Sequence, residues 1–166
     1  MGSKIQTLME VATRYGAEVL SVDYREHPAG VAHDPNQPGE ADRRVAQLLT
    51  TQLPAHEQLV LVGSSMGGYV STLASQTLRP AGLFLLAPAF YLPGYAQQEP
   101  VPNAPQICVV HGWGDDVVPT ANSIRFAEKH QADLYVLAGD HRLNAVLPKI
   151  LPVFEQFLQR ISRAAA

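Results

Sequence analysis

The chain has 166 residues, of which 46% are hydrophobic and 16% charged, and its formal net charge is −3. This length and composition predict one globular domain over residues 1–166, and the weakly acidic balance argues against nucleic acid or an anionic membrane surface as a partner. The N-terminal segment lacks the continuous apolar core of a signal peptide, and no run of residues is long enough to cross a bilayer. We therefore expect a cytoplasmic protein. The single cysteine, Cys108, lies in an apolar run, which predicts a buried side chain and no disulfide.

Two hydrophobic periodicities alternate along the chain, one typical of helices and the other of buried strands. Strands that alternate with helices predict an α/β fold, a three-layer αβα sandwich with a mainly parallel sheet. In the last helix we expect Pro148 and Pro152 in or before the first turn, because proline disrupts a helix interior. In chain order, we expect a helix over 3–15, a strand over 17–24, a proline-rich loop over 25–40, a helix over 39–52, a strand over 59–63, a helix over 66–78, a strand over 81–87, a loop over 88–104, a strand over 106–112, a helix over 119–130, a strand over 132–138 and a helix over 145–161.

The proline-rich loop holds histidines that lie near aspartates in the sequence. His27 and His33, together with Asp23 and Asp34, have the side-chain chemistry of a metal cluster. A loop of this composition is more typical of a solvated surface segment, and we expect no metal site there.

The segment LVLVGSSMGGYVSTLA (59–74) joins a buried strand to a helix through two serines flanked by glycines. Gly63, Ser65 and Gly67 fit the pattern G-x-S-x-G. At such a junction the chain turns so sharply that the central residue takes a strained conformation, and glycines two positions away on either side avoid collisions. The pattern therefore indicates Ser65 as an exposed nucleophile at the carboxyl edge of the sheet.

Two further features of this junction bear on its chemistry. The backbone N–H of Met66 would point to where an oxyanion develops, and Ser64 is only the flanking residue. A plain glycine-rich turn or a phosphate-binding loop is the alternative interpretation. The sequence contains neither G-x-G-x-x-G nor G-x-x-x-x-G-K-S/T, which weakens the phosphate interpretation.

A reactive serine needs a base and an orienting carboxylate, and both follow later strands. HGWGDDVVP (111–119) supplies Asp115 or Asp116, and AGDHRLN (138–144) supplies His141. The carboxyl ends of parallel strands meet at one edge of a sheet, where such sheets bind ligands. The order serine, aspartate, histidine at three strand ends therefore favours a catalytic triad.

Together these segments resemble an α/β-hydrolase of the small, lidless esterase kind. GSSMGG resembles the nucleophile elbow of that family, HGWGDDVVP resembles its acid loop H-G-x-x-D-x-x-V-P, and GDHRL resembles the loop that bears its histidine. The resemblance implies that Ser65 is the nucleophile, Asp115 the acid, His141 the base and the Met66 N–H one oxyanion donor. Asp116 is the competitor for the acid.

The loop over 88–104 follows the strand that we expect beside the elbow strand, and it is rich in aromatic residues. We expect Phe90, Tyr91 and Tyr95 to line a shallow acyl or alcohol pocket, although loop packing would also explain them. Trp113, beside the acid, is a second wall of that pocket or a core residue.

The sequence departs from the family pattern at its start. The family normally has a strand that ends in His-Gly, supplies the second oxyanion N–H and lies between the strands that correspond here to 17–24 and 59–63. This chain opens directly in the helix that follows such a strand, so we expect a sequence shortened at its N-terminus. If the sequence is not shortened, the position of the missing strand cannot stay empty, because backbone groups of its neighbours would be unpaired. Strand 17–24 then closes directly onto 59–63, or another chain supplies a strand. The last alternative predicts a homo-oligomer formed through the sheet edge.

The functional expectation is a serine hydrolase that cleaves small carboxylic esters or thioesters through an acyl-enzyme. It implies a small-molecule substrate and no metal or organic cofactor. The alternative is a catalytically impaired α/β-hydrolase-like protein with a binding or scaffolding role, which the absent first strand suggests.

Overall fold

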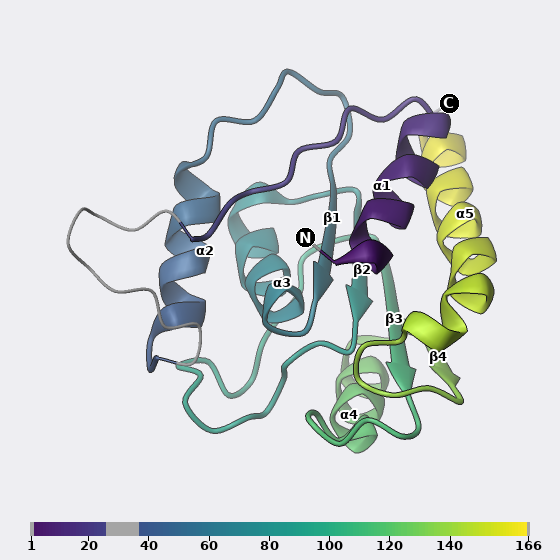
Figure 1. Cartoon of the computed structure of the whole chain (residues 1–166). Helices are drawn as coiled ribbons and strands as arrows, with labels where there is room; N and C mark the ends of the chain where they lie inside the picture. Colours follow the sequence, from purple (N-terminus) through teal and green to yellow (C-terminus); the bar gives the residue numbers. More distant parts are fainter. Residues whose placement is uncertain (1, 26–36, 166) are drawn as a thin grey trace.

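A four-stranded parallel sheet forms the centre of the protein, whose computed structural model describes residues 2–25 and 37–165 (Figure 1). Each strand pairs with the next one along the chain, so the order in the sheet is β1-β2-β3-β4. All four carboxyl ends therefore meet at one edge of the sheet. The strands are β1 (Val60–Ser64), β2 (Gly82–Leu86), β3 (Gln106–Gly112) and β4 (Asp133–Leu137).

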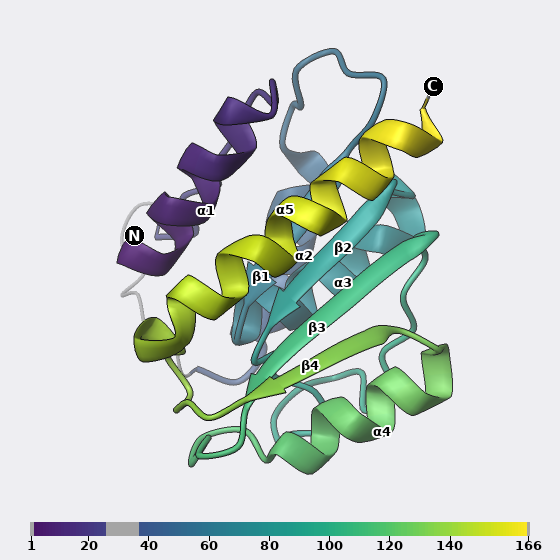
Figure 2. The ribbon, with the colours of Figure 1, turned by 90° about the vertical axis from the view of Figure 1, so that its right-hand side faces the viewer.

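Helices cover both faces of this sheet and give the three layers that the alternating pattern predicts (Figure 2). α1 (Ser3–Arg14) and α5 (Leu147–Ala164) lie on one face, and α2 (Glu40–Thr50), α3 (Met66–Leu78) and α4 (Thr120–His130) lie on the other. Side chains of β2 alternate between the faces: Phe84 and Leu86 join the core under α1 and α5, and Leu83 and Leu85 join the opposite core. The predicted fold class is confirmed.

The segment over 17–24 is not a strand, and this prediction was wrong. Residues 17–23 form no ladder with β1 or with any other described strand, and Leu20 is half exposed. Two cavities, of about 230 and 430 Å³, separate the segment from β1; Leu20 and Val22 line both of them, and so does Leu61 of β1. The apolar, alternating sequence of this segment is not enough to make it a strand, because a strand also needs a backbone partner within hydrogen-bonding distance.

Direct closure of this segment onto β1, one of the alternatives to a shortened N-terminus, is therefore not observed in the described residues. In the described part of the chain, β1 pairs with β2 on one edge and has no strand on its other edge. The space between β1 and the segment over 17–24 is called the β1 gap below. Residues 26–36 of the proline-rich loop, which include His27, His33 and Asp34, lie outside the described residues.

The C-terminal helix also differs from its predicted form. A short 3-10 turn (Asn144–Val146) leads into α5, and Pro148 lies in the first turn as expected. Pro152, however, lies inside the helix. Its position is compatible with helix because its ring fixes φ near the helical value, while the neighbouring apolar side chains Ile150 and Phe154 remain buried in the core.

Candidate active site

The chain turns sharply at Ser65, between β1 and α3. Ser65 has φ 55° and ψ −118°, a conformation that residues with a side chain rarely adopt. A Cβ atom at Gly63 would lie 2.1 Å from the carbonyl oxygen of Gly67, and one at Gly68 would lie 2.7 Å from Pro88 Cβ. A Cβ at Gly67 would meet no atom within 4 Å. The glycines that this turn requires are therefore Gly63 and Gly68, which corrects the expectation for Gly67.

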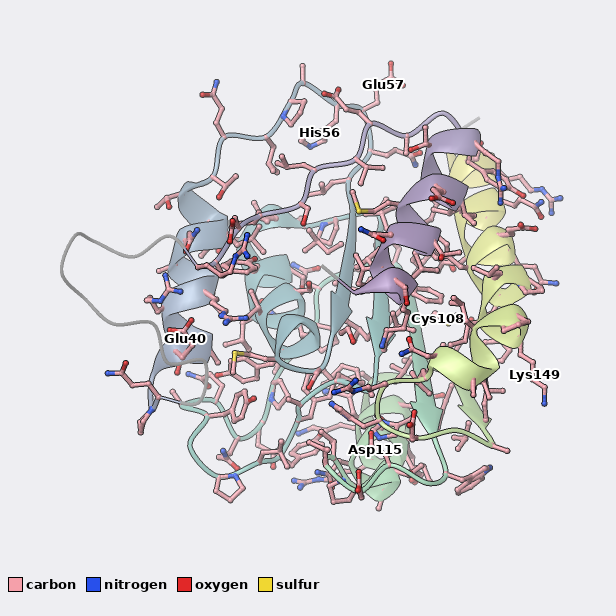
Figure 3. All side chains as sticks on the ribbon, viewed as in Figure 1. Glu40, His56, Glu57, Cys108, Asp115 and Lys149 are labelled. Atoms are coloured by element: carbon pink, nitrogen blue, oxygen red, sulfur yellow. The ribbon has the colours of Figure 1, made fainter. Side chains whose placement is uncertain are left out.

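The structure brings Ser65, His141 and Asp115 into one hydrogen-bonded chain. His141 Nε2 lies 3.0 Å from Ser65 Oγ, and His141 Nδ1 lies 2.7 Å from Asp115 Oδ2. The three residues follow β1, β4 and β3, and Figure 3 shows Asp115 beyond the carboxyl ends of the strands. Nucleophile, base and orienting acid therefore have the mutual geometry that nucleophilic catalysis requires.

The carboxylate of Asp115 is held on both oxygens. Its Oδ1 accepts hydrogen bonds of 2.8 Å from the N–H groups of Val117 and Val118, and its side chain is fully buried. Burial alone would raise the pKa of Asp115, but the hydrogen bonds from His141 and from these two N–H groups outweigh burial and lower that pKa. Asp115 is therefore an anion at neutral pH, as an orienting acid must be. Asp116 is exposed.

A second histidine, His111, also contacts the carboxylate of Asp115. His111 is fully buried, and its Nε2 lies 3.0 Å from both Asp115 Oδ2 and the carbonyl oxygen of Val118. Both neighbours are acceptors, so Nε2 carries the proton, and Nδ1 accepts from the Ser123 hydroxyl at 2.6 Å. His111 is therefore a buried, hydrogen-bonded imidazole that supports the acid loop from within the core.

Met66 is the first residue of α3, directly after Ser65. The first N–H groups of a helix have no acceptor within the helix, and we find none for the Met66 N–H elsewhere in the described residues. This donor is therefore available beside the serine.

The four aromatic residues expected to form a pocket lie in different surroundings. Phe90 is fully buried against Phe126, with ring centroids 4.3 Å apart, so it is a core residue in this structure. Tyr91 lies under the guanidinium of Arg125, and Tyr95 packs edge-on against Tyr69. Trp113 is 64% exposed, which excludes the core alternative. None of the four lines the cavity that touches His141.

Lys4 is part of the surroundings of the site that sequence reasoning missed. Its ammonium donates hydrogen bonds to Ser64 Oγ at 3.1 Å and to the carbonyl oxygen of Arg142 at 2.8 Å. A lysine in the first turn of an amphipathic helix is normally a surface residue, and nothing in its sequence neighbourhood distinguishes it. Only the packing of α1 beside the elbow brings it to the site.

Similarity to solved structures identifies the family. A hydrolase of the α/β superfamily from Xanthomonas campestris pv. campestris is 30% identical in sequence, with a TM-score of 0.77, over 95% of this chain and 90% of its own. This chain belongs to the α/β-hydrolase superfamily. No protein-family model and no curated protein matches the sequence.

Two further α/β hydrolases have the same fold. A lidless α/β serine hydrolase from Xanthomonas campestris is 26% identical, with a TM-score of 0.60, over 81% of this chain and 62% of its own. An α/β serine hydrolase homologue from Coxiella burnetii is 20% identical, with a TM-score of 0.70, over 94% of this chain and 76% of its own. Membership in the superfamily, shown by the 30% identical hydrolase, supports hydrolase activity in general for this chain.

Residues 2–25 and 37–165 contain neither a metal-binding cluster nor a membrane-spanning helix. No cluster of three or more histidine, cysteine, aspartate or glutamate side chains there could hold a metal ion. No helix there has the length and apolar character needed to span a bilayer. Cys108 is buried and unpaired, and burial raises the pKa of its thiol to about 12, so it is not a reactive thiolate at neutral pH.

Proposed function

We propose that this α/β hydrolase is a serine hydrolase that cleaves small carboxylic esters or thioesters. The observation that carries the proposal is the continuous hydrogen-bonded chain from Ser65 Oγ through His141 to Asp115 Oδ2. Family membership alone would support a hydrolase of unspecified chemistry. The chain of three groups adds the nucleophile and its base.

In the proposed reaction, Ser65 Oγ attacks the ester carbonyl carbon and His141 Nε2 takes the hydroxyl proton. The carbonyl oxygen becomes an anion, and the Met66 N–H stabilises it. When the bond to the leaving alcohol or thiol breaks, His141 returns the proton to that group and an acyl-serine remains. Water then attacks the acyl-enzyme with the same proton transfers and releases the acid.

The ionised Asp115 keeps His141 in the tautomer that has Nδ1 protonated, so that Nε2 is free to act as a base. Its two backbone hydrogen bonds and the buried His111 keep the carboxylate in place during the reaction. We expect small or surface-presented esters as substrates, since one of the similar α/β serine hydrolases has no lid.

An alkyl fluorophosphonate, with intact-mass detection of the labelled protein, tests the nucleophile. We expect one label on the wild-type protein, none on Ser65→Ala and nearly full labelling of Ser64→Ala, since only residue 65 occupies the strained turn. Turnover of p-nitrophenyl acetate should follow the same order.

Equal loss of labelling in both folded variants would contradict the assignment of Ser65. A folded wild-type protein that neither takes the label nor hydrolyses the ester would instead favour the catalytically impaired binding protein.

A further inference from the structure

A cavity of about 320 Å³ lies directly beside the base of the triad. The start of α1 forms one wall, and the loop that carries His141 forms another. Ser64 connects the cavity to the elbow. Its lining consists of Gly2, Ser3, Lys4, Ile5, Ser64, His141, Arg142 and Asn144. A group bound there would therefore contact His141, whose Nε2 is 3.0 Å from the nucleophilic oxygen.

Lys4 is the main charged group of this cavity, and only 7% of its surface is exposed. Its two hydrogen-bond partners, the Ser64 hydroxyl and the Arg142 carbonyl, are both uncharged. In the described residues no carboxylate lies within ion-pair distance of its ammonium. An ammonium has three N–H donors, so one of them has no partner in the described part of the chain.

A buried cation without an opposite charge is energetically costly. Burial lowers the pKa of Lys4, and the more distant carboxylates of Asp140 and Asp115 offset that effect only in part. A ligand that brings a negative charge into the cavity would compensate this cost. The hydrogen bonds to Ser64 and Arg142 do not themselves require a charge at position 4, because an uncharged donor side chain could also make them.

The rest of the lining also favours an anion. Arg142 is exposed and adds a second positive charge at the same cavity. None of the lining residues is acidic. An anionic ligand would therefore gain charge-assisted hydrogen bonds without facing a like charge at the cavity wall.

We propose that this cavity is a subsite for a carboxylate of the substrate, so that the preferred esters carry an acidic group a few bonds from the cleaved carbonyl. The inference rests on the proposed ester hydrolysis and adds the substrate class. Lys4 is the principal contact and Arg142 the secondary one. His141, at the border between subsite and triad, sets the short distance between the carboxylate and the reacting carbonyl.

Binding to the Ser65→Ala protein tests the subsite without requiring turnover. Calorimetric titration compares 4-acetoxybenzoate with 4-acetoxybenzamide, which has a neutral amide in place of the carboxylate. Methyl hydrogen succinate and methyl succinamate form a second matched pair, with the carboxylate on the acyl side of the ester. In at least one pair we expect the carboxylate to bind about tenfold more tightly than the amide, the ratio that one good charged contact supplies.

Lys4→Met in the same background should bring that ratio close to one. Lys149→Met is the matched control, because Lys149 is an exposed lysine on α5 outside the cavity lining, and it should leave the ratio unchanged (Figure 3). Should Lys4→Met fail to fold, Arg142→Gln serves as the second variant, since Arg142 is exposed; it should reduce the ratio about threefold.

The inference is overturned when neither carboxylate binds more tightly than its amide, or when the preference survives in every folded cavity variant. Hydrolysis of the same four esters by the wild-type protein separates this result from failure of the proposed function. Carboxylate-selective binding without any Ser65-dependent hydrolysis would remove the esterase and keep the subsite. Hydrolysis that depends on Ser65 but shows no carboxylate preference would keep the esterase and remove the subsite.

Discussion

Asp115 and Asp116 are adjacent in sequence but have different surroundings. The carboxylate of Asp115 is fully buried and accepts hydrogen bonds from His141 and from two backbone N–H groups. Asp116 is exposed. The acid-loop pattern favoured Asp115 by its position after His111, and the geometry gives the physical reason: only one of the two carboxylates faces the imidazole.

This difference predicts unequal effects of removing each charge. Asp115→Asn should lower kcat for p-nitrophenyl acetate by about three to four orders of magnitude, because the amide favours the wrong imidazole tautomer. Asp116→Asn should change kcat less than about twofold, since an exposed charge contributes little. Steady-state kinetics on the two purified variants, with circular dichroism to verify folding, provides the measurement. The opposite order would transfer the role of the acid to Asp116.

At the scale of elements, β1 is the strand whose surroundings are least complete. The Leu59 carbonyl accepts the Ala81 N–H on the side of β2. Backbone groups of successive residues point to opposite edges of a strand, so the N–H groups of Val60 and Val62 face the β1 gap. Two cavities lie along that edge, and no described strand pairs there.

Hydrogen exchange should therefore differ along this one strand. We expect the amides of Val60 and Val62 to exchange at least about tenfold faster than those of Leu61 and Gly63, which face β2. Exchange measured residue by residue by NMR at low protein concentration provides the test. Equal protection of all four amides would mean that a strand fills the β1 gap. Protection that grows with protein concentration would identify that strand as part of a second copy.

At the scale of the whole molecule, most of the order of elements and the meeting of three polar residues at one sheet edge could be predicted, because both depend on local patterns. Strands β1 to β4 are short apolar runs with clear turn signals, and Ser65, Asp115 and His141 each follow one of them. Features that depend on distant partners could not be predicted. The segment over 17–24 has a strand-like pattern but lacks a backbone partner, and the burial of Lys4 depends on residues 60 and 138 positions away.

The stability of the whole molecule should also depend on a buried carboxylate far from the triad. Glu40, at the start of α2, is 4% exposed and pairs with Arg43 and Arg44 (Figure 3). Hydrogen bonding from Arg43 lowers the pKa of Glu40 to about 2, against the effect of burial and with further help from Arg44. Because the pKa in the folded state lies below the unfolded value, this stabilisation is complete above about pH 4.5 and is lost as the pH falls towards 2.

Glu40→Gln should therefore lower the free energy of unfolding at pH 7 by about 1–3 kcal/mol and by much less near pH 2. Urea unfolding at a series of pH values measures both quantities. Glu57→Gln is the matched control, because Glu57 is exposed, and it should change neither value appreciably (Figure 3). A pH-independent effect of Glu40→Gln would show that the carboxylate contributes by packing and not by charge.

The side-by-side packing of α1 and α5 has a consequence for how the protein is made. Leu8 and Val11 of α1 share one core with Ile150 and Phe154 of α5, and Lys4 contacts the carbonyl of Arg142. During synthesis α1 leaves the ribosome long before α5 exists, so the part of its apolar side that α5 covers in the finished protein stays exposed until then. A nascent chain that stops before α5 should therefore hold α1 loosely, leave the α1 wall of the carboxylate subsite unfixed and offer an apolar helix face to chaperones.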